Sequence, residues 1–77
     1  MNITILYFAS LRDQMEKAED HIHCTAATTV EQVWQLANPD CAMPSNTLVA
    51  VNQNYVALHT ALHNNDEVAF FPPVTGG

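Results

Sequence analysis

One amphipathic segment constrains the fold of this chain more than any other feature. The run Thr28-Thr29-Val30-Glu31 fits the S/T-x-x-E capping box, in which side chains and backbone satisfy free N–H groups reciprocally, and it predicts a helix that begins at Thr28. Asn38-Pro39 ends this helix, because the residue before a proline disfavours the α region. A single apolar stripe at i, i+3, i+4 and i+7 indicates that the helix packs on a sheet; its members are Val30, Val33, Trp34 and Ala37.

Several other segments have the composition of β-strands. Residues 2–8 (NITILYF) are β-branched and aromatic with apolar side chains on both faces, which is typical of a central strand. Residues 9–18, with Leu11 and Met15 at i and i+4, predict a short helix or a wide connection. Turns are expected at Gln53-Asn54 and at Asn64-Asn65-Asp66, where Asn tolerates the left-handed region. The further predicted strands are residues 20–25, 47–52, 55–58 and 67–71.

This order of elements predicts an α+β fold with one layer of helix on one sheet. The β-grasp, or ubiquitin-like, architecture fits it: a mixed sheet of four to five strands packed on one main helix, with the first and last strands side by side at the centre. The expected domain is residues 1–71, and residues 72–77 form an extended C-terminal tail.

The alternation of side chains in the last strand predicts an apolar surface on the open face of the sheet. If Val68 and Phe70 meet the helix, Phe71 lies on the opposite side. Phe8 of the first strand shares that side with Leu6, and Tyr55 is expected to join them. Apolar side chains on the uncovered face of a small domain suggest a partner site. The alternative is a scatter of ordinary surface hydrophobic residues, which are common in proteins.

The charge of the chain narrows the class of partner. Its 77 residues carry a formal net charge of -6, and the only fixed cations are Arg12 and Lys17. Nucleic acid is excluded as an expected partner, since phosphate binding needs clustered cations, whereas a partner with a basic groove would be attracted. No segment has the roughly 20 apolar residues that span a bilayer, so we expect no membrane association and a cytoplasmic location, with Cys24 and Cys41 as reduced thiols.

The histidines give no support to a metal or catalytic site. His21 and His23 would project from one side of a strand, with Ile22 and Cys24 inward, but no third ligand with matching spacing accompanies them. His59 and His63 are not accompanied by a Ser, Cys or Asp arrangement of the kind found in triads. We therefore predict no metal site.

The end of the chain has the features of a reactive tail. Gly76 and Gly77 are the only glycines in the sequence, and without side chains they would pass through a channel too narrow for other residues. Pro72 and Pro73 favour extension, and six extended residues reach roughly 20 Å. A terminal carboxylate is ionised at pH 7 and is a poor acyl donor, so any transfer chemistry at Gly77 requires prior activation.

Three stretches resemble the small, sulfur-carrying subunits of molybdopterin synthases, which belong to the MoaD/ThiS ubiquitin-like family. They are Leu6-Tyr7-Phe8-Ala9, Val51-Asn52-Gln53 and the terminal run DEVAFFPPVTGG of residues 66–77. The chain departs from the family at Asn65, where a Gly is expected, and residues 38–46 are a looser match.

The resemblance implies a sulfur-donating subunit rather than a complete catalyst. In this family an ATP-dependent adenylating enzyme, similar to the activators of ubiquitin, charges the tail, and a sulfur nucleophile converts the terminal glycine into a thiocarboxylate. The large synthase subunit then binds the tail and transfers two sulfurs to cyclic pyranopterin monophosphate, which forms the dithiolene of molybdopterin. A heterotetramer of small and large subunits is implied, with no cofactor bound to the small one.

Carried over to this chain, the resemblance makes Gly77 the adenylated and thiocarboxylated residue. The partner contacts are Phe71, Phe8 and Tyr55. Besides Gly77, the tail consists of Pro72, Pro73, Val74, Thr75 and Gly76.

Three alternative functions remain: a sulfur carrier for thiamine thiazole synthesis or tRNA thiolation, a ubiquitin-like modifier joined to lysines through Gly77, and a plain binding module.

Overall fold

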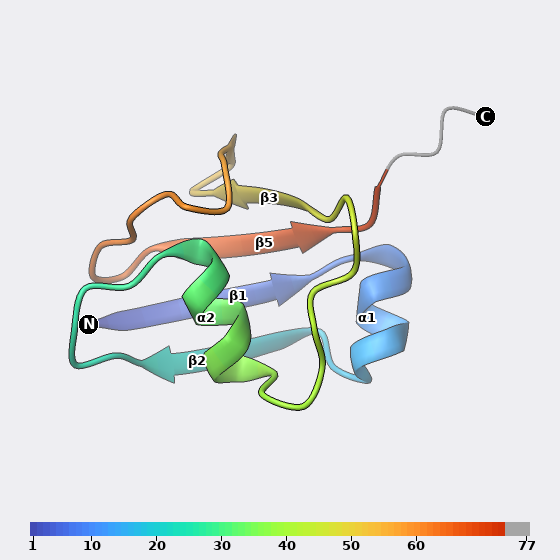
Figure 1. Ribbon diagram of the computed structural model, residues 1–77, viewed down its shortest axis with the longest axis horizontal. Coiled ribbons are helices and arrows are strands. Elements are labelled where there is room, and N and C mark those ends of the chain that lie inside the picture. The colour runs from blue at the N-terminus through green and yellow to red at the C-terminus, as the bar shows by residue number, and fades with distance from the viewer. Residues whose placement is uncertain (74–77) are drawn as a thin grey trace.

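A computed structural model describes residues 1–73 and shows one five-stranded mixed sheet with helix α2 across one face (Figure 1). The strand order is β2-β1-β5-β3-β4, in which β1 and β5 are parallel and the other neighbours are antiparallel. The predicted β-grasp fold is therefore confirmed, with first and last strands adjacent. The elements are β1 (Asn2–Tyr7), α1 (Ala9–Met15), β2 (Glu19–His23), α2 (Val30–Ala37), β3 (Leu48–Val51), β4 (Asn54–Tyr55) and β5 (Glu67–Phe71).

The core lies between α2 and the inward face of the sheet. Trp34 is its central side chain, with its ring edge-on to Phe70 at a centroid distance of 4.9 Å and to Tyr7 at 5.9 Å. The indole N–H donates to the Cys41 carbonyl at 2.8 Å, so the buried polar atom is satisfied. The predicted stripe is confirmed, because Val30, Val33 and Trp34 are buried and Ala37 packs against the core.

The N-terminus of α2 differs from the prediction by one residue. Thr29, not Thr28, is the N-cap: its hydroxyl oxygen accepts from the Gln32 N–H at 3.3 Å, and the Gln32 side chain accepts from the Thr29 N–H at 2.9 Å. Thr28 instead makes hydrogen bonds outside the helix: its hydroxyl donates to the Ala26 carbonyl, and its own carbonyl accepts from the Leu62 N–H. The predicted box of Thr28 and Glu31 is therefore wrong, and the same motif operates one position later.

The β3–β4 hairpin also differs from the prediction. Its two central residues are Asn52 and Gln53, both with positive φ as a type I′ turn requires, rather than Gln53 and Asn54. The returning strand ends at Tyr55 instead of residue 58. The reason is that the carbonyls of Leu58 and Thr60 accept from the first N–H groups of α2, at 3.0 and 3.1 Å, which draws the chain out of the sheet.

The remaining elements follow the prediction closely. A short helix occupies the residue 9–18 segment, and Asn65 has φ 69° in the turn before β5. β2 covers residues 19–23 where a strand over 20–25 was predicted; both histidines are exposed and Ile22 packs against the core, as does Cys24 directly after the strand. Neither of the helices in residues 1–73 is long enough to cross a membrane.

The capping box gives a stability prediction. Thr29→Ala removes the side-chain acceptor for a helix N–H and should lower the free energy of unfolding by about 1 kcal/mol. Thr25→Ala, at an exposed loop position, is the matched control and should change stability by less than about 0.5 kcal/mol. Urea denaturation followed by circular dichroism measures both; equal effects of the two substitutions would contradict the assignment of the cap.

Candidate functional site

The open face of the sheet carries an aromatic patch formed by Phe8, Tyr55 and Phe71. The rings of Phe8 and Phe71 are stacked, with centroids 4.7 Å apart and planes 8° from parallel. Tyr55 lies 6.1 Å from Phe71 at a tilt of 54°. Tyr55 is 72% exposed and Phe8 is 40% exposed, so much of this apolar surface contacts solvent. The structure thus brings together the three residues that the sequence analysis selected as partner contacts.

The register of the central strands determines the shape of the patch. Leu6 pairs with Ala69 across the β1–β5 boundary, and Ala50 lies opposite Ala69 and Tyr55 from its place in β3. Small side chains in the middle leave a depression of about 290 Å³ bordered by the three aromatic rings and Leu6. The surface is therefore hollowed at its centre, as a site for an inserted partner side chain would be.

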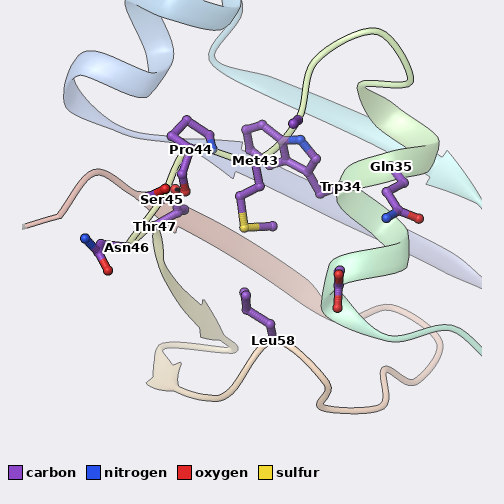
Figure 2. A pocket seen from close by; sticks show the side chains of 10 residues that line it. Trp34, Gln35, Met43, Pro44, Ser45, Asn46, Thr47 and Leu58 are labelled. Atoms are coloured by element: carbon purple, nitrogen blue, oxygen red, sulfur yellow. Dashed lines mark hydrogen bonds between the residues drawn. The ribbon is translucent and has the colours of Figure 1, made fainter.

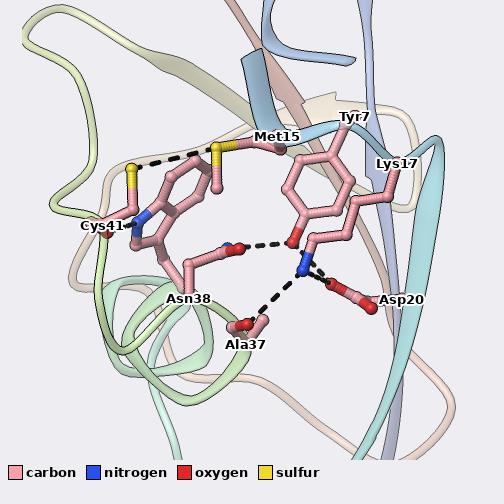
Figure 3. Close-up of polar contacts among 8 residues, drawn as sticks. Tyr7, Met15, Lys17, Asp20, Ala37, Asn38 and Cys41 are labelled. Carbon is pink, nitrogen blue, oxygen red and sulfur yellow. Dashed lines mark hydrogen bonds and ion pairs between the residues drawn. The ribbon is translucent and has the colours of Figure 1, made fainter. Parts of the chain in front are cut away.

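A polar network fixes the end of β1 immediately before Phe8. The Tyr7 hydroxyl donates to Asp20 at 2.9 Å and accepts from the Asn38 side-chain amide at 3.0 Å (Figure 3). The Lys17 ammonium lies 2.7 Å from the Asp20 carboxylate and 5.5 Å from the centre of the Tyr7 ring. Burial, reinforced by Asp20 and opposed by Asn38, raises the pKa of Tyr7 well above its usual range. The network ties β1 to β2 and to the end of α2.

The chain leaves β5 at the end that carries the aromatic patch. Pro72 follows Phe71 directly and is half-buried, and Pro73 is exposed. The predicted tail residues Val74, Thr75, Gly76 and Gly77 lie outside the described residues. The described part of the chain therefore places the start of the tail beside Phe71.

The histidines make local surface contacts. His21 Nε2 lies 3.0 Å from a Glu19 carboxylate oxygen, and His23 Nδ1 lies 2.9 Å from the Asn2 side-chain oxygen. Among residues 1–73 no group of three His, Cys, Asp or Glu side chains is arranged to hold a metal ion. Cys24 is buried and Cys41 is partly exposed, and both are free thiols.

The chain is similar in sequence to the members of one protein family. The model of the ThiS family matches residues 5–77. A molybdopterin synthase sulfur carrier subunit of Haemophilus influenzae is 36% identical, and one of Escherichia coli K12 is 39% identical; each match covers 97% of this chain and 99% of the relative. The chain belongs to the ThiS family.

Solved structures give the same fold for this ThiS-family chain. SAMP1 from Haloferax volcanii superposes with a TM-score of 0.83 at 22% identity, over 100% of both chains. A complex of subunits 1 and 2 of molybdopterin-converting factor from Helicobacter pylori has a matching chain with a TM-score of 0.69 at 17% identity, over 100% of both chains. At these identities the likeness concerns the β-grasp architecture alone.

A second concave surface of the ThiS-family chain was missed by the sequence reasoning. It lies on the helix side, between α2 and residues 42–47, and has a volume of about 540 Å³. Trp34 and Met43 border it from above, and Leu58 faces it from the chain after β4 (Figure 2). The only signal in the sequence was the apolar pair Met43-Pro44 inside a segment expected to be an irregular loop.

The raised pKa of Tyr7 predicts a pH dependence of stability. Tyrosine in an unfolded chain titrates near pH 10, whereas folded Tyr7 keeps its proton to higher pH, so its contribution to stability is complete below about pH 10 and is lost above it. Tyr7→Phe should therefore weaken the fall in unfolding free energy between about pH 9.5 and 11. The exposed Tyr55→Phe is the control, and denaturant titrations across this pH range provide the measurement. An unchanged slope in Tyr7→Phe would show that another group causes the fall.

Proposed function

We propose that this protein is the sulfur carrier subunit of a molybdopterin synthase, with Gly77 as the carrier residue. The observation that supports this most strongly is the full-length similarity to two sulfur carrier subunits at 36% and 39% identity. The family match extends to residue 77 and so includes the Gly-Gly end. The aromatic patch beside the start of the tail gives a second, independent support, because it is a concave apolar surface where a partner would need to hold the domain.

The proposed chemistry begins with activation of the ionised Gly77 carboxylate. A carboxylate oxygen attacks the α-phosphorus of ATP in the activating enzyme, which forms an acyl adenylate and releases pyrophosphate. Hydrosulfide, HS⁻, then displaces AMP at the carbonyl carbon, loses its proton and leaves a thiocarboxylate. Its sulfur is the donor to cyclic pyranopterin monophosphate, and hydrolysis of the acyl–sulfur bond regenerates the carboxylate. Adenylation is needed because the free carboxylate is a poor acyl donor.

Two proteins are the proposed partners. The large subunit of the synthase catalyses the transfer and forms a heterotetramer with this chain, which is consistent with the paired subunits 1 and 2 in the Helicobacter pylori complex. An adenylating enzyme similar to ubiquitin activators consumes the ATP. Both require the tail and the aromatic patch, so they bind in turn. A basic surface on each partner would suit the net charge of -6, and a cytoplasmic location remains part of the prediction.

The carrier chemistry is tested by intact-mass spectrometry. After incubation with ATP, a sulfur source and the activating enzyme, the chain should gain the mass of one oxygen-to-sulfur exchange, located at Gly77 by fragmentation. A chain lacking Gly77 is the control and should remain unchanged. Absence of the mass gain with an enzyme that is active on another carrier would exclude the proposal, and isopeptide adducts through Gly77 in a cell extract would favour a modifier instead.

The aromatic patch is tested by truncation of its central ring. Phe71→Ala removes the side chain that contacts both Phe8 and Tyr55, and should weaken binding to the large subunit about tenfold or more. Isothermal titration calorimetry measures the affinity, and a thermal melt establishes that the core remains folded. Leu36→Ala, at an exposed apolar position on α2, is the control. Wild-type affinity in Phe71→Ala would contradict the assignment of the patch.

A further inference from the structure

We propose that the partner surface extends from the aromatic patch around the β3–β4 edge to the pocket between α2 and residues 42–47. This inference rests on the proposed function, because the occupant we assign is the large subunit of the synthase. We call the surface along this edge the edge groove. It has a volume of about 350 Å³, and its lining consists of Thr47, Leu48, Val49, Tyr55, Val56, Ala57 and Leu58.

Shared residues make the three concave surfaces continuous. Tyr55 lines both the depression of the aromatic patch and the edge groove. Thr47 and Leu58 line both the edge groove and the helix-side pocket. In Figure 2 the Leu58 side chain points into the pocket toward Met43, so the apolar surface continues from the edge onto the helix side.

The distribution of exposed apolar side chains supports a single extended surface. Five large hydrophobic residues in the described part of the chain are exposed, and four of them follow this path, while Leu36 on α2 lies elsewhere. On the opposite side of the patch, the open face continues into the polar pair Thr4 and His21. The surface beside the patch is therefore polar on that side and apolar toward the edge groove. The four exposed hydrophobic residues along the path are Phe8, Leu48, Tyr55 and Leu58.

The area of the aromatic patch supports the same conclusion. With about 200 Å² for an aromatic side chain, the exposed fractions of Phe8 and Tyr55 leave roughly 200 Å² of accessible ring surface. A standard interface buries about 800 Å² on each partner. The two rings therefore fall well short of that area, and adjoining surface of the folded domain has to supply more of it. The edge groove and helix-side pocket are the adjoining apolar surfaces that provide it.

Charge identifies the chemistry of the occupant. Glu67 borders the depression at one end of this path, and Glu31 borders the helix-side pocket at the other. Neither fixed cation, Arg12 or Lys17, is among the residues that line the three surfaces. The path therefore fits an apolar segment of the large subunit flanked by Lys or Arg, which would meet a carboxylate at each end.

Leu58→Ser tests the extension separately from the proposed function. It should weaken binding of the large subunit about fivefold or more, whereas the control Leu36→Ser, at an exposed leucine off the path, should change affinity less than twofold. A loss of affinity in Phe71→Ala without one in Leu58→Ser would overturn the extension and leave the proposed function standing. Loss in neither would contradict the patch as well. A change in the oligomeric state of the free Leu58→Ser chain, seen by size exclusion, would assign the groove to a second copy.

Oxidation footprinting of the wild-type chain provides a test that needs no substitution. Met43 lines the helix-side pocket, whereas Met1 lines a different depression near residues 23–27. Peroxide should convert Met43 to the sulfoxide at least threefold more slowly in the complex than in the free chain, with Met1 oxidised at the same rate in both. Equal rates for Met43 in the free and bound chain would overturn the proposal.

Discussion

The parallel pairing of β1 with β5 is the interaction on which the two faces of this molecule depend. Leu6 lies opposite Ala69 and Tyr7 lies opposite Phe70, and the Phe8 N–H donates to the Phe70 carbonyl at 3.1 Å. This register turns Tyr7 and Phe70 toward Trp34, and it turns the neighbouring Phe8 and Phe71 toward solvent. A slip of one residue would exchange the two sets, because side chains alternate along a strand. The same hydrogen bonds therefore determine both the core and the candidate site.

The sequence was sufficient to predict this arrangement because both faces of the two strands are apolar. The pair Phe70-Phe71 places one aromatic ring on each side of the sheet whichever way the strand faces, and Val68 then selects the core side by sharing its parity with Phe70. Asp66 and Pro72 delimit β5 within one residue on each side, and the structure confirms residues 67–71 as the strand. Local patterns were thus enough for the fold and for the grouping of the aromatic side chains.

The features that the sequence did not predict depend on contacts between distant segments. Two overlapping capping-box motifs were possible, and the choice of Thr29 over Thr28 follows from the hydrogen bond between the Thr28 carbonyl and Leu62. The early end of β4 has a similar cause, since the carbonyls of Leu58 and Thr60 satisfy free N–H groups of α2. No local pattern records such pairings. The helix-side pocket was missed for the same reason, because Leu58 reaches it only through this departure from the sheet.

The exposed apolar surface and the acidic charge of this domain have complementary effects. A stacked aromatic pair beside a 72% exposed tyrosine would favour self-association in a neutral protein. A net charge of -6 on 77 residues opposes contact between two copies, because like charges repel over roughly the Debye length of 8 to 10 Å. The same charge attracts a cationic partner. Charge therefore distinguishes between partners that the apolar surface alone would accept equally, and the aromatic patch can remain open until an oppositely charged protein covers it.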